Sequence, residues 1–224
     1  MKLLPELMRF VQFTSAKHNI DESHALGHSM KVLLHAHQIY SNTVHLHPYL
    51  KSQEPVIYTA AIVHDMCDKK YMNQSDGIEE INKILNHRLG YAEIMFIKKI
   101  VSTMSYSAVK KNGFPMLGKY QMAYHIVREA DLLSAYDFDR SIIYHMYNSK
   151  EGFENAYVNA MELFENRVLK HHTDNLFVTE YSKKKGYEMY YDAISQINAW
   201  KYIIKSYDVG DSSRVGAPTP PSLL

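Results

Sequence analysis

The chain has 224 residues, a formal net charge of +1, 46% hydrophobic residues and 22% charged residues. The length suits one domain, and the composition is typical of a folded globular protein rather than a disordered or fibrous one. The balanced charge gives nucleic acids and anionic membranes no advantage as partners, and the single cysteine, Cys67, excludes an intrachain disulfide.

The first two predicted helices are amphipathic. Leu3, Leu7 and Val11 recur at helical spacing in the first. The oxygens of residues 21–23 can cap a second helix running to about residue 40. One face of this second helix carries His24, His28, Val32, His35 and Ile39.

The next segment is apolar on nearly every side. Pro55 opens a run over residues 56–63 that predicts a buried helix, and this run ends at His64 and Asp65. An imidazole and a carboxylate packed against alanine and valine cost several kcal/mol unless they are compensated. Metal coordination is one of the few complete compensations, so the pair predicts a cation site.

The remaining sequence also predicts helices. Asp76 and Glu79 form a capping box for a helix through Leu85, and Gly90 separates it from a helix through Val101. A turn-forming stretch over 110–118 precedes a helix over about 120–135, and further helices are expected near 137–148, 153–170 and 179–205. We therefore predict a compact all-α domain over residues 1–208 and a disordered tail over 209–224, which is rich in glycine, proline and serine.

Nothing in the sequence suggests export or membrane insertion. The Met1 end lacks the basic and apolar segments of a secretion signal. No apolar run approaches the roughly 20 residues that a spanning helix needs. We expect a cytoplasmic location and no membrane contact.

Two short motifs and one later aspartate form a pattern of metal-binding side chains. The first motif reads Ser-His-x-x-x-His-x-x-x-Val over residues 23–32, and the second reads His-Asp-x-x-Asp-x-Lys over residues 64–70. Asp131 follows within Arg-Glu-Ala-Asp-Leu-Leu over residues 128–133. Over roughly residues 21–200 this order resembles the HD superfamily of metal-dependent phosphohydrolases, most closely its single-domain branch. Ser-Tyr-Ser at 105–107 and Asn-Arg-Val-Leu-Lys at 166–170 are further similarities.

The resemblance implies one divalent cation in an all-helical HD domain, held by His28, His64, Asp65 and Asp131. Two imidazoles and two carboxylates suit Mn, Fe, Co, Ni, Zn or Mg better than a thiolate-seeking metal, and the choice among these stays open. The implied reaction is attack of metal-activated water on a phosphate ester or anhydride. The implied substrate is a nucleotide or another small phosphorylated metabolite, as expected for a nucleoside triphosphate pyrophosphohydrolase or a nucleotidase.

Other residues are candidates for catalysis and substrate binding. Asp68 is expected to orient or deprotonate the attacking water, and His24 to meet a phosphate or protonate the leaving group. The candidate substrate contacts are Lys70, Arg128, Arg140 and Ser105. The segment 134–138 lacks the glycine that the family usually has there, so the pocket wall and the substrate can differ from those of relatives.

Competing interpretations stay open. Arg128 and Arg140 can instead pair with Glu129 and Asp137, and Ser105 can be a helix cap. The chain can be a regulator that binds metal and nucleotide without turnover, or a di-iron HD oxygenase in which His24 and Asp68 supply further ligands. The basic and aromatic run over 183–191 is better explained as a solvated helix than as a nucleic-acid surface. The oligomeric state is open.

Overall fold

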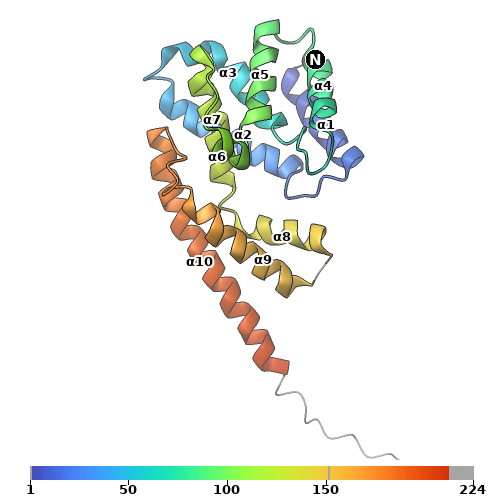
Figure 1. Cartoon of the computed structure of the whole chain (residues 1–224), viewed down its shortest axis with the longest axis vertical. Helices are drawn as coiled ribbons and strands as arrows, with labels where there is room; N and C mark the ends of the chain where they lie inside the picture. The colour runs from blue at the N-terminus through green and yellow to red at the C-terminus, as the bar shows by residue number, and fades with distance from the viewer. Residues whose placement is uncertain (1, 151, 212–224) are drawn as a thin grey trace, which may run out of the picture.

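The computed structural model describes residues 2–150 and 152–211, which form ten α-helices, three short 3-10 helices and no strand (Figure 1). The predicted all-α fold is confirmed. Figure 1 shows most helices gathered in an upper body, a pair of helices below it, and one long helix running down beside both.

The centre of the upper body is α3 (Glu54–Val63), the predicted buried helix. It packs on α1 (Leu3–His18), α2 (Leu26–Thr43), α5 (Tyr91–Thr103) and α7 (Gln121–Ser134). Residues 59–63 are all buried, and the small side chains of Ala60 and Ala61 let neighbouring helices approach closely. A helix surrounded in this way holds its C-terminal end, at His64, in a fixed place.

Shorter elements close the upper body. They are η1 (Pro48–Gln53), α4 (Gln74–Leu85), α6 (Tyr106–Asn112) and η2 (Gly118–Tyr120). The predicted capping box at Asp76 is wrong, because α4 begins earlier. Its N-cap is Asn73, whose side chain accepts a hydrogen bond from the backbone N–H of Ser75 at 3.0 Å.

The lower part consists of α8 (Phe138–Ser149), α9 (Phe153–Asn166), η3 (Val168–Lys170) and α10 (Glu180–Asp211). The predicted helix over 153–170 is interrupted at Arg167, whose backbone is not helical (φ −135°, ψ −63°). The last helix runs to residue 211, so residues 209–211 of the predicted tail are helical. The rest of that tail lies outside the described residues.

Arg128 lies in the core, where α10 meets α7. Its side chain is 2% exposed, pairs with Glu129 at 3.2 Å and donates to the carbonyl oxygen of Leu176. The Glu129 carboxylate also accepts from the backbone N–H of Val178 at 2.7 Å and the hydroxyl of Thr179 at 2.6 Å. The prediction that Arg128 binds substrate is therefore wrong, because the competing pair with Glu129 ties the start of α10 to α7.

None of the helices in the described ranges combines the length and apolar character needed to cross a membrane.

Gly77 allows α4 to pack against the segment that follows His64. A Cβ at this position would lie 2.7 Å from both the Cα of Cys67 and the carbonyl oxygen of Met66. We expect Gly77→Ala to lower the free energy of unfolding by about 1–3 kcal/mol, because the backbone must move to admit the methyl group. Urea denaturation measures this change.

Gly27→Ala is the matched control. A Cβ at residue 27 meets no atom within 4 Å, so the substitution should leave stability unchanged or raise it by up to about 1 kcal/mol through helix propensity. Equal stability of Gly77→Ala and the wild type would contradict the close packing of α4.

Candidate metal centre and pocket

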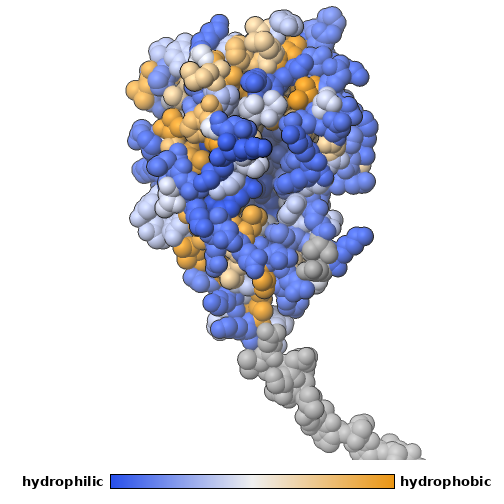
Figure 2. Space-filling view, viewed as in Figure 1, coloured by the Kyte–Doolittle hydropathy of each residue, from blue (hydrophilic) through white to orange (hydrophobic). Residues whose placement is uncertain are grey.

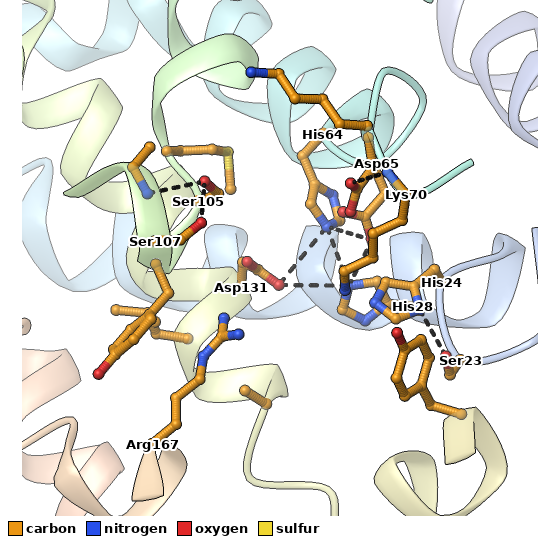
Figure 3. A pocket seen from close by; sticks show the side chains of 18 of the residues that line it. Ser23, His24, His28, His64, Asp65, Lys70, Ser105, Ser107, Asp131 and Arg167 are labelled. Carbon is orange, nitrogen blue, oxygen red and sulfur yellow. Dashed lines mark hydrogen bonds and ion pairs between the residues drawn. The ribbon is translucent and has the colours of Figure 1, made fainter. Parts of the chain in front are cut away.

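Three central helices bring the predicted metal ligands together. His28 lies in the first turn of α2, His64 is the C-cap of α3 with Asp65 directly after it, and Asp131 lies on α7. Because α2, α3 and α7 pack on one another, residues more than 100 positions apart in sequence meet at one point (Figure 3).

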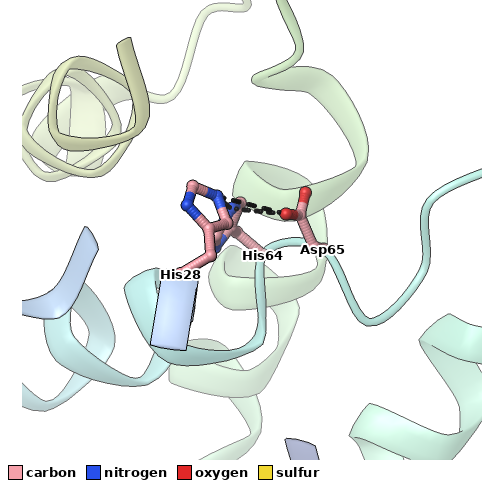
Figure 4. A group of neighbouring side chains, drawn as sticks. All are labelled: His28, His64 and Asp65. Carbon is pink, nitrogen blue, oxygen red and sulfur yellow. Dashed lines mark hydrogen bonds and ion pairs between the residues drawn. The ribbon is translucent and has the colours of Figure 1, made fainter. Parts of the chain in front are cut away.

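His28, His64 and Asp65 form a tight group (Figure 4). The two Nε2 atoms are 3.1 Å apart, and Asp65 Oδ2 lies 3.3 Å from that of His28 and 3.1 Å from that of His64. Each of the three residues offers one ligand atom within 4.8 Å of the others, which is close enough to share one metal ion.

Asp131 approaches the same point from α7. Its Oδ1 lies 3.4 Å from His28 Nε2 and 3.7 Å from His64 Nε2. All four predicted ligands therefore direct a nitrogen or oxygen atom toward one small volume.

The polar atoms of this group fit a divalent cation. Asp65 Oδ2 is buried, and in the described part of the chain its close polar neighbours are the Nε2 atoms of His28 and His64, so its charge is compensated only by imidazoles. His64 Nδ1 lies 2.9 Å from the carbonyl oxygen of Ala61, so Nδ1 carries the proton and Nε2 is left to bind a metal. The mixed nitrogen and oxygen donors suit a first-row transition metal or magnesium.

The charges of the group are strongly coupled. Burial tends to lower the pKa of His64, but the carboxylates of Asp65 and Asp131 outweigh it and raise this pKa to about 9. Burial and the nearby Arg140 lower the pKa of His28. Burial opposes ionisation of Asp65, yet its pKa is held well below the usual range by His64 and His28. The two carboxylates are therefore ionised at neutral pH and attract a cation.

The ligand group lies in the wall of a pocket of about 760 Å³, a size that suits a small-molecule ligand. Figure 2 shows a hollow among mainly hydrophilic side chains on one face of the molecule. The predicted residues His24, Asp68, Lys70, Ser105 and Arg140 all line the pocket. Arg128 is the one predicted site residue that does not.

His24 is held by an unpredicted network at the pocket edge. It lies in the turn before α2, not on the helix as predicted, because the carboxylate of Asp21 bonds within that turn instead of capping α2. His24 Nδ1 is 2.6 Å from the Ser23 hydroxyl and 3.2 Å from the Tyr71 hydroxyl. Both hydroxyls donate to the carboxylate of Asp21, so each can accept a proton from His24 Nδ1. The other ring nitrogen, Nε2, is then the one that can bind a ligand.

Asp68 and Lys70 lie in the turn after Asp65. Asp68 Oδ1 accepts a hydrogen bond from the backbone N–H of Lys70 at 2.9 Å, so the carboxylate has a defined position. Lys70 Nζ lies 5.0 Å from the centre of the Tyr144 ring, within cation–π range. Ser105 is both a pocket residue and the N-cap of α6, accepting from the backbone N–H of Ala108 at 3.3 Å.

Arg140 contacts the metal-ligand group directly. Its Nη1 donates to the carbonyl oxygen of Ser23 at 3.0 Å and lies 2.7 Å from His28 Nδ1. The alternative pair with Asp137 does not form between side chains, because the Asp137 carboxylate pairs with Lys31 at 2.6 Å. The same guanidinium nitrogen lies 3.1 Å from His28 Nε2, so it faces both nitrogens of the imidazole ring.

The sequence analysis missed several pocket residues. They include Arg167, Lys111 and Tyr144. Arg167 belongs to a segment noted for its resemblance to the HD family, but a continuous helix gave no reason to direct its side chain into a pocket.

Comparisons with known proteins give a fold relationship alone. No protein-family model matches the chain, and no curated protein matches it significantly. A crystal structure of a Lactobacillus plantarum protein, solved as a structural genomics target, superposes with a TM-score of 0.68. It is 16% identical in sequence, and the match covers 91% of this chain and 97% of that one.

Substitutions in the ligand group test which of its residues bind a metal ion. We expect His64→Ala and Asp131→Ala each to weaken Mn²⁺ or Zn²⁺ binding by roughly a hundredfold or more, because each removes a donor from the group. Calorimetric titration of the metal-free chain measures the affinity. The exposed residues His45 and Asp192 give matched controls, so His45→Ala and Asp192→Ala should bind metal normally. Equal affinity of Asp131→Ala and Asp192→Ala would remove Asp131 from the ligand set.

Metal affinity should also depend on pH. With a pKa of about 9, His64 is protonated at neutral pH in the metal-free chain, so a cation must displace this proton. Affinity should therefore rise about tenfold per pH unit and level off above the pKa of His64, with about one proton released per ion near pH 7. Titrations in buffers of different ionisation enthalpy measure the release. A pH-independent affinity would show that His64 is neutral before metal binds.

Proposed function

We propose that this protein is a metal-dependent phosphohydrolase of the HD type that acts on a small phosphorylated molecule. The observation that carries the proposal is the convergence of four nitrogen and oxygen donors, three in one tight group and the fourth from Asp131, at the wall of a pocket rimmed by basic residues. The motif order His, His-Asp, Asp supports the assignment to the HD type.

The cation would be held by His28, His64, Asp65 and Asp131. When bound, a divalent ion supplies a Lewis acid that polarises a phosphoryl group and acidifies water. The donor set fits Mn, Fe, Co, Ni, Zn or Mg.

Residues of the chain supply positioning and proton transfer. Asp68 is fixed by the backbone of Lys70 on the pocket wall, where it can orient a water and accept its proton. His24 offers Nε2 to a phosphate oxygen or leaving group, while Nδ1 is held by Ser23 and Tyr71. Lys70 and Arg140 add positive charge near the ligand group, which favours a phosphate over a neutral substrate.

Two other functions were considered from the sequence. A di-iron oxygenase needs a second set of metal ligands, yet in the described part of the chain the close ligand group contains neither His24 nor Asp68. A regulator that binds metal and nucleotide without turnover would use the same pocket, and the presence of Asp68 beside the ligands favours the hydrolase.

An activity screen tests the proposal. The purified metal-free chain is assayed with Mn, Co, Ni, Zn, Fe or Mg and a panel of nucleoside mono-, di- and triphosphates, with released phosphate and pyrophosphate both measured. We expect metal-dependent hydrolysis that falls by about a thousandfold in the His64→Ala, Asp65→Ala double variant. The reason is that this variant can no longer hold the ion that would polarise the phosphoryl group and acidify water.

The His45→Ala, Asp192→Ala double variant is the matched control and should keep full activity. Nucleotide binding without product, in protein that holds metal, would replace the hydrolase with the regulator. Activity that survives in the His64→Ala, Asp65→Ala variant would show that another site carries it.

A further inference from the structure

Arg167 places a second basic group in the pocket. It lies at the break between α9 and η3, its side chain is half-buried, and it lines the pocket. The guanidinium carbon is 4.4 Å from the centre of the Tyr106 ring, so the plane of positive charge rests on an aromatic surface.

The ring beneath Arg167 is itself anchored. The Tyr106 hydroxyl donates to Asp174 Oδ2 at 3.1 Å, and Lys110 Nζ pairs with the same oxygen at 3.0 Å. Asp174 is therefore engaged by Tyr106 and Lys110. Tyr106 is fixed as a platform that sets the position of the guanidinium without neutralising its charge.

Arg167 lacks a protein acceptor. No residue in the described ranges accepts a hydrogen bond from its guanidinium or forms an ion pair with it, whereas Arg128 pairs with Glu129 and Arg140 donates to Ser23. Burial lowers the pKa of Arg167, and the charges of Asp131 and Asp68 oppose this effect only in part. A partly desolvated, immobilised arginine of this kind is complementary to a planar or tetrahedral oxyanion.

Arg167 also lies apart from the other basic pocket residues. Figure 3 shows its guanidinium beside Asp131, on the side of the ligand group opposite His24. Arg140 and Lys70 belong to the His24 side, through contacts with Ser23, His28 and Tyr144. An anion at Arg167 is therefore a different group from one held next to His24.

We propose that Arg167, supported by Tyr106, binds a second anionic group of the substrate, either a phosphate or a carboxylate. The inference rests on the proposed function only in taking the first phosphoryl group to lie at the metal ligands. It makes Arg167 a specificity-determining residue that favours substrates with two charged groups over simple monoesters.

Binding of three phosphonates that cannot be hydrolysed tests the inference. Methylphosphonate has no second anion, phosphonoacetate adds a carboxylate, and methylenediphosphonate adds a second phosphonate. Each is titrated calorimetrically into the full chain with equimolar Mn²⁺, for the wild type, Arg167→Met, Arg167→Lys and the control Arg9→Met, which removes an exposed arginine. Identical metal conditions cancel chelation of the ion by the ligand.

We expect the wild type and Arg9→Met to bind at least one two-anion ligand about tenfold to a hundredfold more tightly than methylphosphonate. The preferred ligand identifies the second group as phosphate or carboxylate. Arg167→Met should lose this preference while binding methylphosphonate normally, and Arg167→Lys should keep part of it. Melting temperatures should stay close to that of the wild type, because Arg167 has no ion pair with the described residues to lose and methionine can keep an apolar contact with the Tyr106 ring.

A preference that survives in Arg167→Met, an equal loss for all three ligands, or no preference in the wild type would overturn the inference. The outcome is separate from the activity screen. A preference that depends on Arg167, in a protein that hydrolyses none of the panel, would keep the second anion site and remove the hydrolase.

Discussion

The His64-Asp65 pair ends a helix that is packed on four sides, and its polar atoms must be satisfied where the core meets the pocket. Hydrogen bonds within the chain meet only part of that need. Ala61 holds one nitrogen of His64, while Nε2 and the carboxylate oxygen of Asp65 are directed at His28 and Asp131. Two buried carboxylates and two imidazoles gathered so closely can satisfy one another only in part, and a cation could supply the remaining compensation. The close packing of α2, α3 and α7 is what keeps the donors from separating.

The two parts of the fold contribute different chemistry to the pocket. The upper body supplies the candidate metal ligands, while α8 and the end of α9 supply Arg140 and Arg167. A ligand that touches both must join the upper body to the α8–α9 pair. The ties between the parts are polar as well as apolar, and they include Glu129 to the start of α10 and Lys31 to Asp137. The relative position of the two arginines and the ligand group therefore depends on one tie in the pocket wall, at Asp137, and one in the core, at Glu129.

The sequence predicted the structure correctly where the local residue pattern and the burial of the segment favoured the same element. The apolar run before His64 predicted the central helix and its end, and the motifs named the His28, His64 and Asp65 that the structure brings into one group able to hold a metal ion. Predictions failed where a tertiary contact decided between two local options. Asp21 could have capped α2, but its carboxylate accepts hydrogen bonds within its own turn and from Tyr71. Arg128 could have lined the pocket, but its side chain lies in the core, where it contacts Glu129 and Leu176. The break at Arg167 has no glycine or proline to mark it, so its place in the pocket could be found only from the packed structure.

The contact between Arg140 and His28 links the positive charge of the pocket to the candidate ligand group. One guanidinium nitrogen lies within hydrogen-bond distance of both imidazole nitrogens, and Nε2 also faces His64 and Asp65. A cation at Nε2 and the guanidinium would therefore compete for the same ring. Occupancy of the one site would change the orientation and the hydrogen-bonding capacity of the other.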